Sequence, residues 1–572
     1  MTRFGPLREG PEVRFRLWAP DAAKVWLLRP DAPAVAMTRG ADGFHSVSLP
    51  AAEGQLYRFR IGELEVPDPA SRAQAEDVEG WSRLVGPVPP PRSCAIRPWA
   101  EAIIAEVHVG TATPQGSFDA LRAALPDYVA AGYTALELMP VADFPGRWNW
   151  GYDGVLPFAP DTRYGTPEGL RALVDAAHAS GLAMLLDVVY NHFGPSGNFL
   201  SQYAGAFFST AERTPWGSAI DLANPTVRAF FVENAVMWLR DYDFDGLRLD
   251  AVHAFIPGGG DALLAEIATA CRAVKPDAWL VLENDDNAAR WLSRTSLPAY
   301  TAQWNDDFHH ALHVIATGQR SGYYGDYADD PVGALARCLT EGFAFQGEAS
   351  SHRGGASRGE ASAHLPPGAF VAFVQNHDQI GNRPFGDRLA AALAPERIAV
   401  LQFVVMLSPQ IPLFFMGEEV GATTPFPFFC DFGGDLAEAV REGRAREFAG
   451  FFADHAGGPD DLPDPLAKTT VERARLRPGP DAAARRARFA ALAQLRRRLV
   501  WPLTIAGDTP ATELVRDGDA LRIEWHFAVG TLTLAVNFGA QPACLTLPTA
   551  PPDAIEGALL APWSAALWSR PA

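Results

Sequence analysis

Cysteine is scarce in this sequence. Five cysteines occur among 572 residues, an odd number, and they lie far apart with no CxxC pair. This distribution is typical of a reducing compartment, and it argues against a disulfide framework or a zinc site. The five are Cys94, Cys271, Cys338, Cys430 and Cys544.

The sequence also lacks a long apolar run and an excess of basic residues. The longest apolar stretch, residues 398–407, is too short to span a bilayer, and the opening MTRFGPLREG has no apolar core of a signal peptide. The formal net charge is −19 and the pI is near 5.1, which argues against a nucleic acid or an anionic membrane as partner. We therefore expect a cytoplasmic protein.

The chain is long enough for two to four domains. Short alternating apolar and polar stretches over residues 12–63, punctuated by Gly, Pro and Asp, predict a small β-sandwich. The proline-rich residues 86–100 indicate a stiff linker. We expect a β-sandwich resembling a carbohydrate-binding module over residues 1–95, a central domain over 96–490 and a small β-domain over 491–572.

The central region alternates short apolar strands with helical patterns. The helices at 166–181 and 224–242 each begin with a capping residue followed by proline. Eight near-continuous apolar strands with intervening helices predict an α/β fold, a (β/α)₈ TIM barrel. The predicted strands are residues 102–110, 134–140, 183–192, 244–253, 278–285, 300–306, 370–378 and 411–419.

Two long loops interrupt the predicted barrel. One spans residues 191–223. The other spans residues 307–369, and its part at 346–368 is rich in Gly, Ser and Ala with Arg and His. Such a loop is either disordered or a lid that closes over substrate.

Polar residues cluster at the carboxyl ends of these strands, where the active site of a TIM barrel lies. In GLRLDAVH (residues 246–253), Arg248 and Asp250 lie two apart and so share one face of a strand. Arg248 would lower the pKa of Asp250 and keep it ionised. From these residues alone, a buried structural ion pair and an active-site pair are equally good readings.

Three carboxylates at strand ends point to glycoside hydrolysis. Asp250, Glu283 and Asp378 end three different strands. Such chemistry needs one carboxylate to attack or stabilise the anomeric carbon and another to protonate the leaving oxygen. Burial and nearby negative charge would raise the pKa of Glu283, which suits the acid.

Aromatic residues in the loop after the second strand suit sugar stacking. Trp148, Trp150 and Tyr152 lie among glycines there. The alternative is that they pack inward as loop anchors, which we expect of at least one.

Four strings resemble the signature regions of the α-amylase family of glycoside hydrolases. They are DVVYNH (187–192), GLRLDAVH (246–253), the stretch at Glu283 and FVQNHDQIGN (373–382), in the family's order. The resemblance implies a retaining mechanism with Asp250 as nucleophile, Glu283 as general acid/base and Asp378 as transition-state stabiliser. It also implies that the attacked glucose is bound by Tyr152, His192, Arg248 and His377.

Further strings resemble the branch of this family that acts on maltooligosyltrehalose and releases trehalose. They include ENDDN (283–287) and QWNDDFHHALH (303–313). By this resemblance the enzyme cleaves the α-1,4 bond next to the terminal trehalose unit, as an α-glucan hydrolase without a cofactor or metal. The additional substrate-binding residues that we expect are His253, Asp306, Asp307, His309, Gln379, Asn382 and Arg383.

Three alternatives stay open at this stage. A glycogen branching enzyme would use the same carboxylates but transfer the glucan to a 6-hydroxyl. A debranching hydrolase is a second possibility within the family. A non-catalytic glucan-binding protein on the same barrel is a third, and the presence of all three carboxylates disfavours it.

Overall fold

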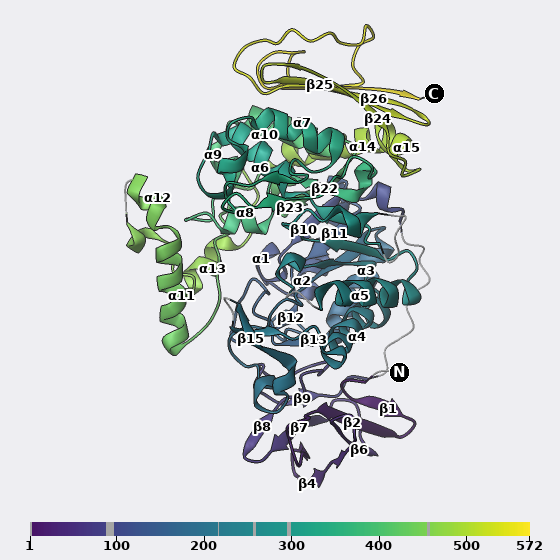
Figure 1. The fold of residues 1–572 in the computed structure, drawn as a ribbon, viewed down its shortest axis with the longest axis vertical. Coiled ribbons are helices and arrows are strands. Elements are labelled where there is room, and N and C mark those ends of the chain that lie inside the picture. The colour runs from purple at the N-terminus through teal and green to yellow at the C-terminus, as the bar shows by residue number, and fades with distance from the viewer. Residues whose placement is uncertain are drawn as a thin grey trace.

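The computed structural model describes residues 3–86, 97–214, 217–255, 259–293, 299–454 and 458–571. Its centre is a closed barrel of eight parallel strands in sequence order, between two N-terminal sheets and one C-terminal sheet (Figure 1). Each barrel strand falls within one of the eight predicted segments, so the barrel prediction is confirmed. The strands are β10 (Ile104–Val107), β11 (Ala135–Leu138), β14 (Ala183–Val188), β17 (Gly246–Leu249), β18 (Trp279–Leu282), β19 (Ala302–Trp304), β22 (Phe370–Phe373) and β23 (Ile411–Phe415).

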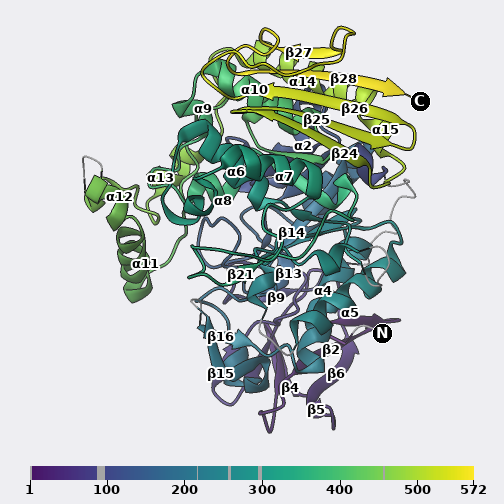
Figure 2. The same cartoon turned by 45° about the horizontal axis from the view of Figure 1, so that its top comes forward.

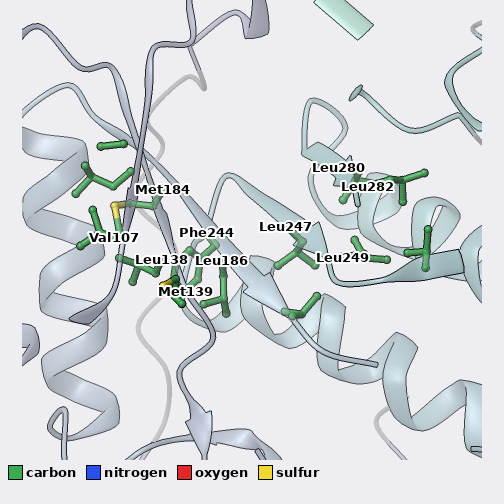
Figure 3. Close-up of a cluster of buried hydrophobic side chains, with 14 of the residues drawn as sticks. Val107, Leu138, Met139, Met184, Leu186, Phe244, Leu247, Leu249, Leu280 and Leu282 are labelled. Atoms are coloured by element: carbon green, nitrogen blue, oxygen red, sulfur yellow. The ribbon is translucent and has the colours of Figure 1, made fainter. Parts of the chain in front are cut away.

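Alternation along each strand separates the inside of the barrel from its outside. One cluster of buried side chains fills the interior and includes Ile104, Leu185 and Phe373. The intervening residues, such as Leu186 and Leu247, pack outward against the helices (Figure 3). Because both faces are covered, the strands are apolar on both sides, as parallel strands usually are.

The helices follow the predicted pattern, and side chains cap them. Thr166 accepts a hydrogen bond from the Gly169 N–H at 3.1 Å and starts α3. Asn224 accepts one from Thr226 at 2.9 Å and starts α4. The helices are α1 (Val109–Ala112), α2 (Phe118–Ala131), α3 (Pro167–Ala179), α4 (Pro225–Asp241), α5 (Gly260–Val274), α6 (Asp306–Thr317), α7 (Pro331–Glu341), α8 (His377–Gly381), α9 (Leu389–Ala392), α10 (Pro395–Leu407), α11 (Gly434–Glu447), α12 (Ala449–Asp454), α13 (Lys468–Ala474), α14 (Ala482–Leu499) and α15 (Trp501–Thr504). Among the described residues, no helix is long and apolar enough to cross a membrane.

Two antiparallel sheets lie at the N-terminal end, as predicted. Phe15 of one sheet packs against Tyr57 of the other with ring centroids 4.9 Å apart. Of the predicted linker, residues 87–96 lie outside the described part of the chain. The strands are β1 (Leu7–Glu9), β2 (Glu12–Trp18), β5 (Thr38–Arg39) and β6 (Phe44–Pro50) in one sheet, and β3 (Trp26–Arg29), β4 (Ala32–Ala36), β7 (Leu56–Ile61), β8 (Leu64–Val66) and β9 (Ser82–Arg83) in the other.

A five-stranded antiparallel sheet lies at the C-terminal end, as predicted, and covers α7 and α10 (Figure 2). The long helix α14 precedes it. Arg496 of α14 is fully buried, and its guanidinium donates to the carbonyl oxygens of Met406, Ser408 and Gln410 at 2.6–2.8 Å. This side chain therefore binds α14 to the segment that joins α10 to β23. The strands of the sheet are β24 (Ala511–Asp517), β25 (Ala520–Phe527), β26 (Gly530–Asn537), β27 (Ala554–Glu556) and β28 (Ser564–Pro571).

The prediction that residues 307–369 form one long loop is wrong. Helices α6 and α7 occupy much of it, and a short hairpin occupies the Gly- and Ser-rich part. The predicted loop at 191–223 also contains a hairpin. The hairpins are β20 (Glu348–Ala349) with β21 (Ser357–Arg358), and β15 (Phe208–Thr214) with β16 (Gly217–Ile220); a further pair is β12 (Ala142–Asp143) with β13 (Leu156–Pro160).

Replacing Arg496 should destabilise the fold. Arg496→Ala leaves three buried carbonyl groups without their donor, each costing about 1–3 kcal/mol. We expect a clearly lower thermal unfolding temperature by calorimetry. Arg498→Ala, which removes an exposed arginine of the same helix, is the matched control and should leave the temperature unchanged. Equal temperatures for both variants would contradict the role of Arg496.

Candidate active site

The carboxyl ends of the barrel strands bring the predicted residues together. Asp187 lies in β14 and Arg248 in β17, and Asp250 follows β17. Glu283 directly follows β18, and Asp378 lies in α8, just after β22. Parallel barrel strands all end at the same mouth, so these five side chains converge there.

Arg248 holds three of these carboxylates at once. Its Nη1 donates to Asp187 Oδ2 and to Asp250 Oδ1, each at 2.7 Å. Its Nη2 donates to Glu283 Oε2 at 2.9 Å. The side chain is 0% exposed and its guanidinium lies 4.1 Å from the centre of the Trp304 ring. The two readings of GLRLDAVH thus describe one arrangement: a buried ion pair places Asp250 beside Glu283.

Burial has the largest effect on the pKa values of two of the carboxyl groups bound to Arg248, those of Asp250 and Glu283. Burial raises the pKa of Asp250 to about 6, although Arg248 acts to lower it. Burial also raises the pKa of Glu283 to about 7, against Arg248 and with the negative charge of Asp250 adding to the effect. The expectation that Arg248 would dominate the pKa of Asp250 is therefore wrong, because lost hydration outweighs the ion pair. The expected raised pKa of Glu283 agrees with the structure.

Asp378 is paired with the protonated side chain of His377. The Nε2 of His377 lies 3.3 Å from Asp378 Oδ1, and its Nδ1 contacts Glu106. Although burial opposes it, the charges of Asp378 and Glu106 raise the pKa of His377 well above its ordinary value. In turn His377 lowers the pKa of Asp378 against the effect of burial. Asp378 therefore carries a fixed negative charge at the barrel mouth.

Tyr152 and His192 lie on the same side of the mouth. The Tyr152 hydroxyl donates to Asp187 Oδ2 at 2.7 Å, and its ring stacks on His377 with centroids 5.1 Å apart. The His192 Nε2 lies 2.9 Å from the Tyr152 carbonyl oxygen. Burial lowers the pKa of His192 to about 4, so its imidazole is neutral at neutral pH. That both residues bind the attacked glucose remains a prediction.

The two tryptophans of the same loop have anchoring contacts. Trp150 is buried, stacks on Phe426 at 5.2 Å and donates to the Pro427 carbonyl oxygen at 3.2 Å. Trp148 donates to the Cys430 carbonyl oxygen at 3.0 Å. The expectation that at least one loop aromatic packs inward is confirmed.

Asp306 and Gln379 lie close to the predicted acid. The Gln379 amide nitrogen is 3.5 Å from Asp306 Oδ1, and its oxygen accepts from the Asn376 N–H at 2.9 Å. Burial raises the pKa of Asp306 well above its ordinary value, and the charges of Glu283 and Asp285 add to this. These two residues remain predicted substrate contacts.

Three other predicted contacts lie nearer the surface. His253 is exposed, and its Nδ1 accepts from the Asp285 N–H at 3.2 Å. Asn382 is exposed at the end of α8, and Arg383 beside it is half-buried. All three remain predictions of substrate binding.

Asp307 and His309 occupy a different environment from the one predicted. Both are 0% exposed. Asp307 accepts hydrogen bonds from Tyr327, Asn287 and two backbone N–H groups at 2.5–2.9 Å. His309 contacts the Tyr324 hydroxyl at 3.0 Å. Their polar atoms are hydrogen-bonded to other residues of the protein. The structure therefore favours a supporting role for both in place of direct sugar contact.

Asp307, Arg353 and Arg358 form a set of ion pairs, here called the clamp, that holds the loop after Glu283. Arg358 of β21 lies 2.8 Å from Asp307 and 2.9 Å from Asp285, and it also donates to the Asp285 carbonyl oxygen at 2.8 Å. Arg353 of the same hairpin binds Asp285 at 2.5 Å and Asp286 at 2.7 Å. The hairpin thus fixes the residues that directly follow Glu283.

Three residues that the structure places at or beneath this site were not predicted from the sequence. The hairpin arginines Arg353 and Arg358 had a weak signal, as isolated charges in a Gly- and Ser-rich string. Glu137 had the same signal as Arg248, a charge within an apolar strand.

Comparison with known proteins identifies the class. No protein-family model matches the chain. A malto-oligosyltrehalose trehalohydrolase of Deinococcus radiodurans is 39% identical over 488 residues, which cover 83% of this chain and 79% of that protein. One from Saccharolobus solfataricus is 39% identical over 78% of this chain and 80% of its own length. A branching enzyme of Mycobacterium bovis is 34% identical over 43% of this chain and 34% of its own length.

Comparison with solved structures points to the same class of enzymes. A crystal structure from Salmonella typhimurium, described as that of a putative alpha amylase, has a TM-score of 0.94 and 41% identity over 99% of both chains. A pullulanase of Anoxybacillus, complexed with maltotetraose, shares the fold alone, with a TM-score of 0.70 and 17% identity over 99% of this chain and 87% of its own. The protein is a glycoside hydrolase of the α-amylase type. Within that class the chain belongs to the malto-oligosyltrehalose trehalohydrolase family.

The two raised pKa values predict a bell-shaped pH dependence. With Asp250 as nucleophile and Glu283 as acid, as the resemblance implies, activity would require Asp250 ionised and Glu283 protonated. In that case kcat/KM should rise through the pKa of about 6 and fall through the pKa of about 7. Because the two groups interact, the limbs report the pair. Measurement of kcat/KM on an α-glucan across this range checks the prediction. A profile without an alkaline limb would contradict Glu283 as the acid.

Loss of the clamp should lower kcat more than it raises KM. Arg358→Met frees Asp285 and the loop after Glu283, and misplacement of a catalytic group by about 1 Å costs roughly 10²-fold. Steady-state kinetics measures both constants. Arg337→Met is the matched control, since Arg337 binds Glu348 of the same hairpin but not Asp285. Equal kinetics for the two variants would show that the clamp does not position Glu283.

Proposed function

We propose that the protein is a retaining glycoside hydrolase that cleaves the α-1,4-glucosidic bond next to the terminal trehalose of maltooligosyltrehalose and releases trehalose. The observation that carries the chemistry is the Arg248 fork, which holds Asp250 and Glu283 side by side with separated pKa values. The names of the relatives support the substrate.

In the first step, Asp250 attacks the anomeric carbon of the glucose on the non-trehalose side. The bond to the trehalose oxygen breaks, and Glu283 gives its proton to that oxygen. Trehalose leaves, and a glycosyl ester forms on Asp250. A protonated Glu283 and an ionised Asp250 suit this step, and their carboxyl groups should lie about 5–5.5 Å apart.

In the second step, the Glu283 carboxylate takes a proton from water, and the water oxygen attacks the same carbon. The ester bond breaks, Asp250 regains its charge and the maltooligosaccharide is released with its original anomeric configuration. Asp378, with its fixed charge, stabilises the positive charge on the ring in both transition states. Tyr152, His192 and His377 bind the glucose that is attacked.

The rival within the family is a glycogen branching enzyme. It would pass the glycosyl group from Asp250 to a glucan 6-hydroxyl in place of water. The similarity to the Mycobacterium bovis branching enzyme covers 43% of this chain, against 83% for the trehalohydrolase of Deinococcus radiodurans. The larger matched share of the chain favours hydrolysis, and analysis of the reaction products distinguishes hydrolysis from transfer.

Product analysis tests the substrate. The protein is incubated with maltooligosyltrehalose and, separately, with a plain maltooligosaccharide of equal length. We expect free trehalose from the first and much slower cleavage of the second. New α-1,6 branches on a longer glucan without trehalose would overturn the proposal in favour of the branching enzyme.

The nucleophile is tested separately. Asp250→Ala should abolish turnover and leave the fold intact, because the ester can no longer form. Asp329→Ala is the control, since that aspartate is fully exposed and its ion pair in the described part of the chain is with Arg320. Substantial activity in the Asp250 variant would refute the assignment.

A further inference from the structure

Glu137 is a buried acid that the proposed reaction does not use. It lies in β11 and is 1% exposed. Neither of its carboxyl oxygens has a hydrogen-bond partner among the described residues. An ionised carboxylate in such a place would cost several kcal/mol, so its position needs an explanation.

The strand register places Glu137 inside the barrel, beneath the mouth. It pairs with Glu106 of β10 on one side and with Leu185 of β14 on the other. Leu185 belongs to the cluster that fills the barrel, so Glu137 points the same way. Asp187 lies two residues beyond Leu185 on the same face of β14. Glu137 is therefore one layer below the carboxylates that Arg248 holds.

The neighbouring cations are committed elsewhere. Glu106 is paired with His377. Both terminal nitrogens of Arg248 are bound to Asp187, Asp250 and Glu283. No arginine, lysine or histidine among the described residues forms an ion pair with Glu137.

The charges of Asp187 and Arg248 both act on Glu137. Each of these two residues has a polar atom without a partner among the described residues: Asp187 Oδ1, which is an acceptor, and Arg248 Nε, which is a donor. A neutral carboxylic acid offers one donor and one acceptor, and so it matches both. An ionised carboxylate offers acceptors only and would leave Asp187 Oδ1 unsatisfied. One internal water is enough to span any gap between such groups.

We propose that Glu137 is a neutral acid that donates a hydrogen bond toward Asp187 Oδ1 and accepts one from Arg248 Nε, directly or through one internal water. It is a positioning residue that fixes Asp187 and Arg248 from below. Consistent with this, burial raises the pKa of Glu137 well above its ordinary value, and the charge of Glu106 adds to the effect.

Two substitutions distinguish a neutral, hydrogen-bonding Glu137 from an ionised one. Glu137→Gln keeps a donor and an acceptor in the same shape, so kcat should stay within about threefold and the pH limbs should not move. Glu137→Leu removes both, and kcat should fall about 10–10²-fold with a smaller change in KM, as expected when reacting groups lose their alignment. Leu185→Met, a change in the neighbouring interior side chain, controls for altered packing.

Infrared difference spectroscopy of the wild type against Glu137→Gln gives a reading that does not need activity. We expect the variant to lose one protonated-carboxyl band that persists at a pH where Glu283 has lost its proton. Absence of this band would overturn the proposal. So would loss of activity in Glu137→Gln equal to that in Glu137→Leu, or full activity in Glu137→Leu. The kinetic measurements rest on the proposed hydrolysis only because they use it as the assay. The infrared measurement does not depend on it, so the proposal for Glu137 and the proposed function can fail separately.

Discussion

The buried guanidinium of Arg248 is the interaction on which the site depends. One planar group contacts carboxylates that lie in or just after three different strands, so the positions of β14, β17 and β18 all converge on it. A lysine could supply the charge but not the fork, because an ammonium has no two parallel donors in a fixed plane. The Trp304 ring lies against the guanidinium, with the guanidinium carbon 4.1 Å from the ring centre.

Much of the fold could be predicted from the sequence, because each barrel strand is a short apolar run between helical patterns. Even β19, with three residues, was found, since its apolar residues precede a polar helix start. The predicted loop at 307–369 failed for a local reason. The string GEASSHRGGASRG has no apolar periodicity, and the helices α6 and α7 before it were absorbed into the same segment.

The candidate site also contains residues that could be predicted from the sequence and residues that could not. Asp250, Glu283 and Asp378 could be predicted, because strand ends converge wherever the barrel closes. Asp306 and Asp307 could not be told apart, since both start α6 and look alike in sequence. Successive helical residues differ by about 100°, so one lies beside Glu283 and its neighbour points into the clamp with Arg358. Only the packing of the hairpin against α6 decides which is which.

The charge balance of the site explains how it favours a transition state. Two cations, Arg248 and His377, are paired with five carboxyl groups: Glu106, Asp187, Asp250, Glu283 and Asp378. Glu283 in its acid form, and in our proposal Glu137, add no charge. The remaining carboxyl groups outnumber the two cations, which favours a negative potential at the mouth before substrate arrives. A neutral glucan gains little from this field, whereas a ring with developing positive charge gains much in a buried site of low dielectric. A fully balanced set of charges would bind both states alike and lose that preference, since only interactions stronger in the transition state speed the reaction.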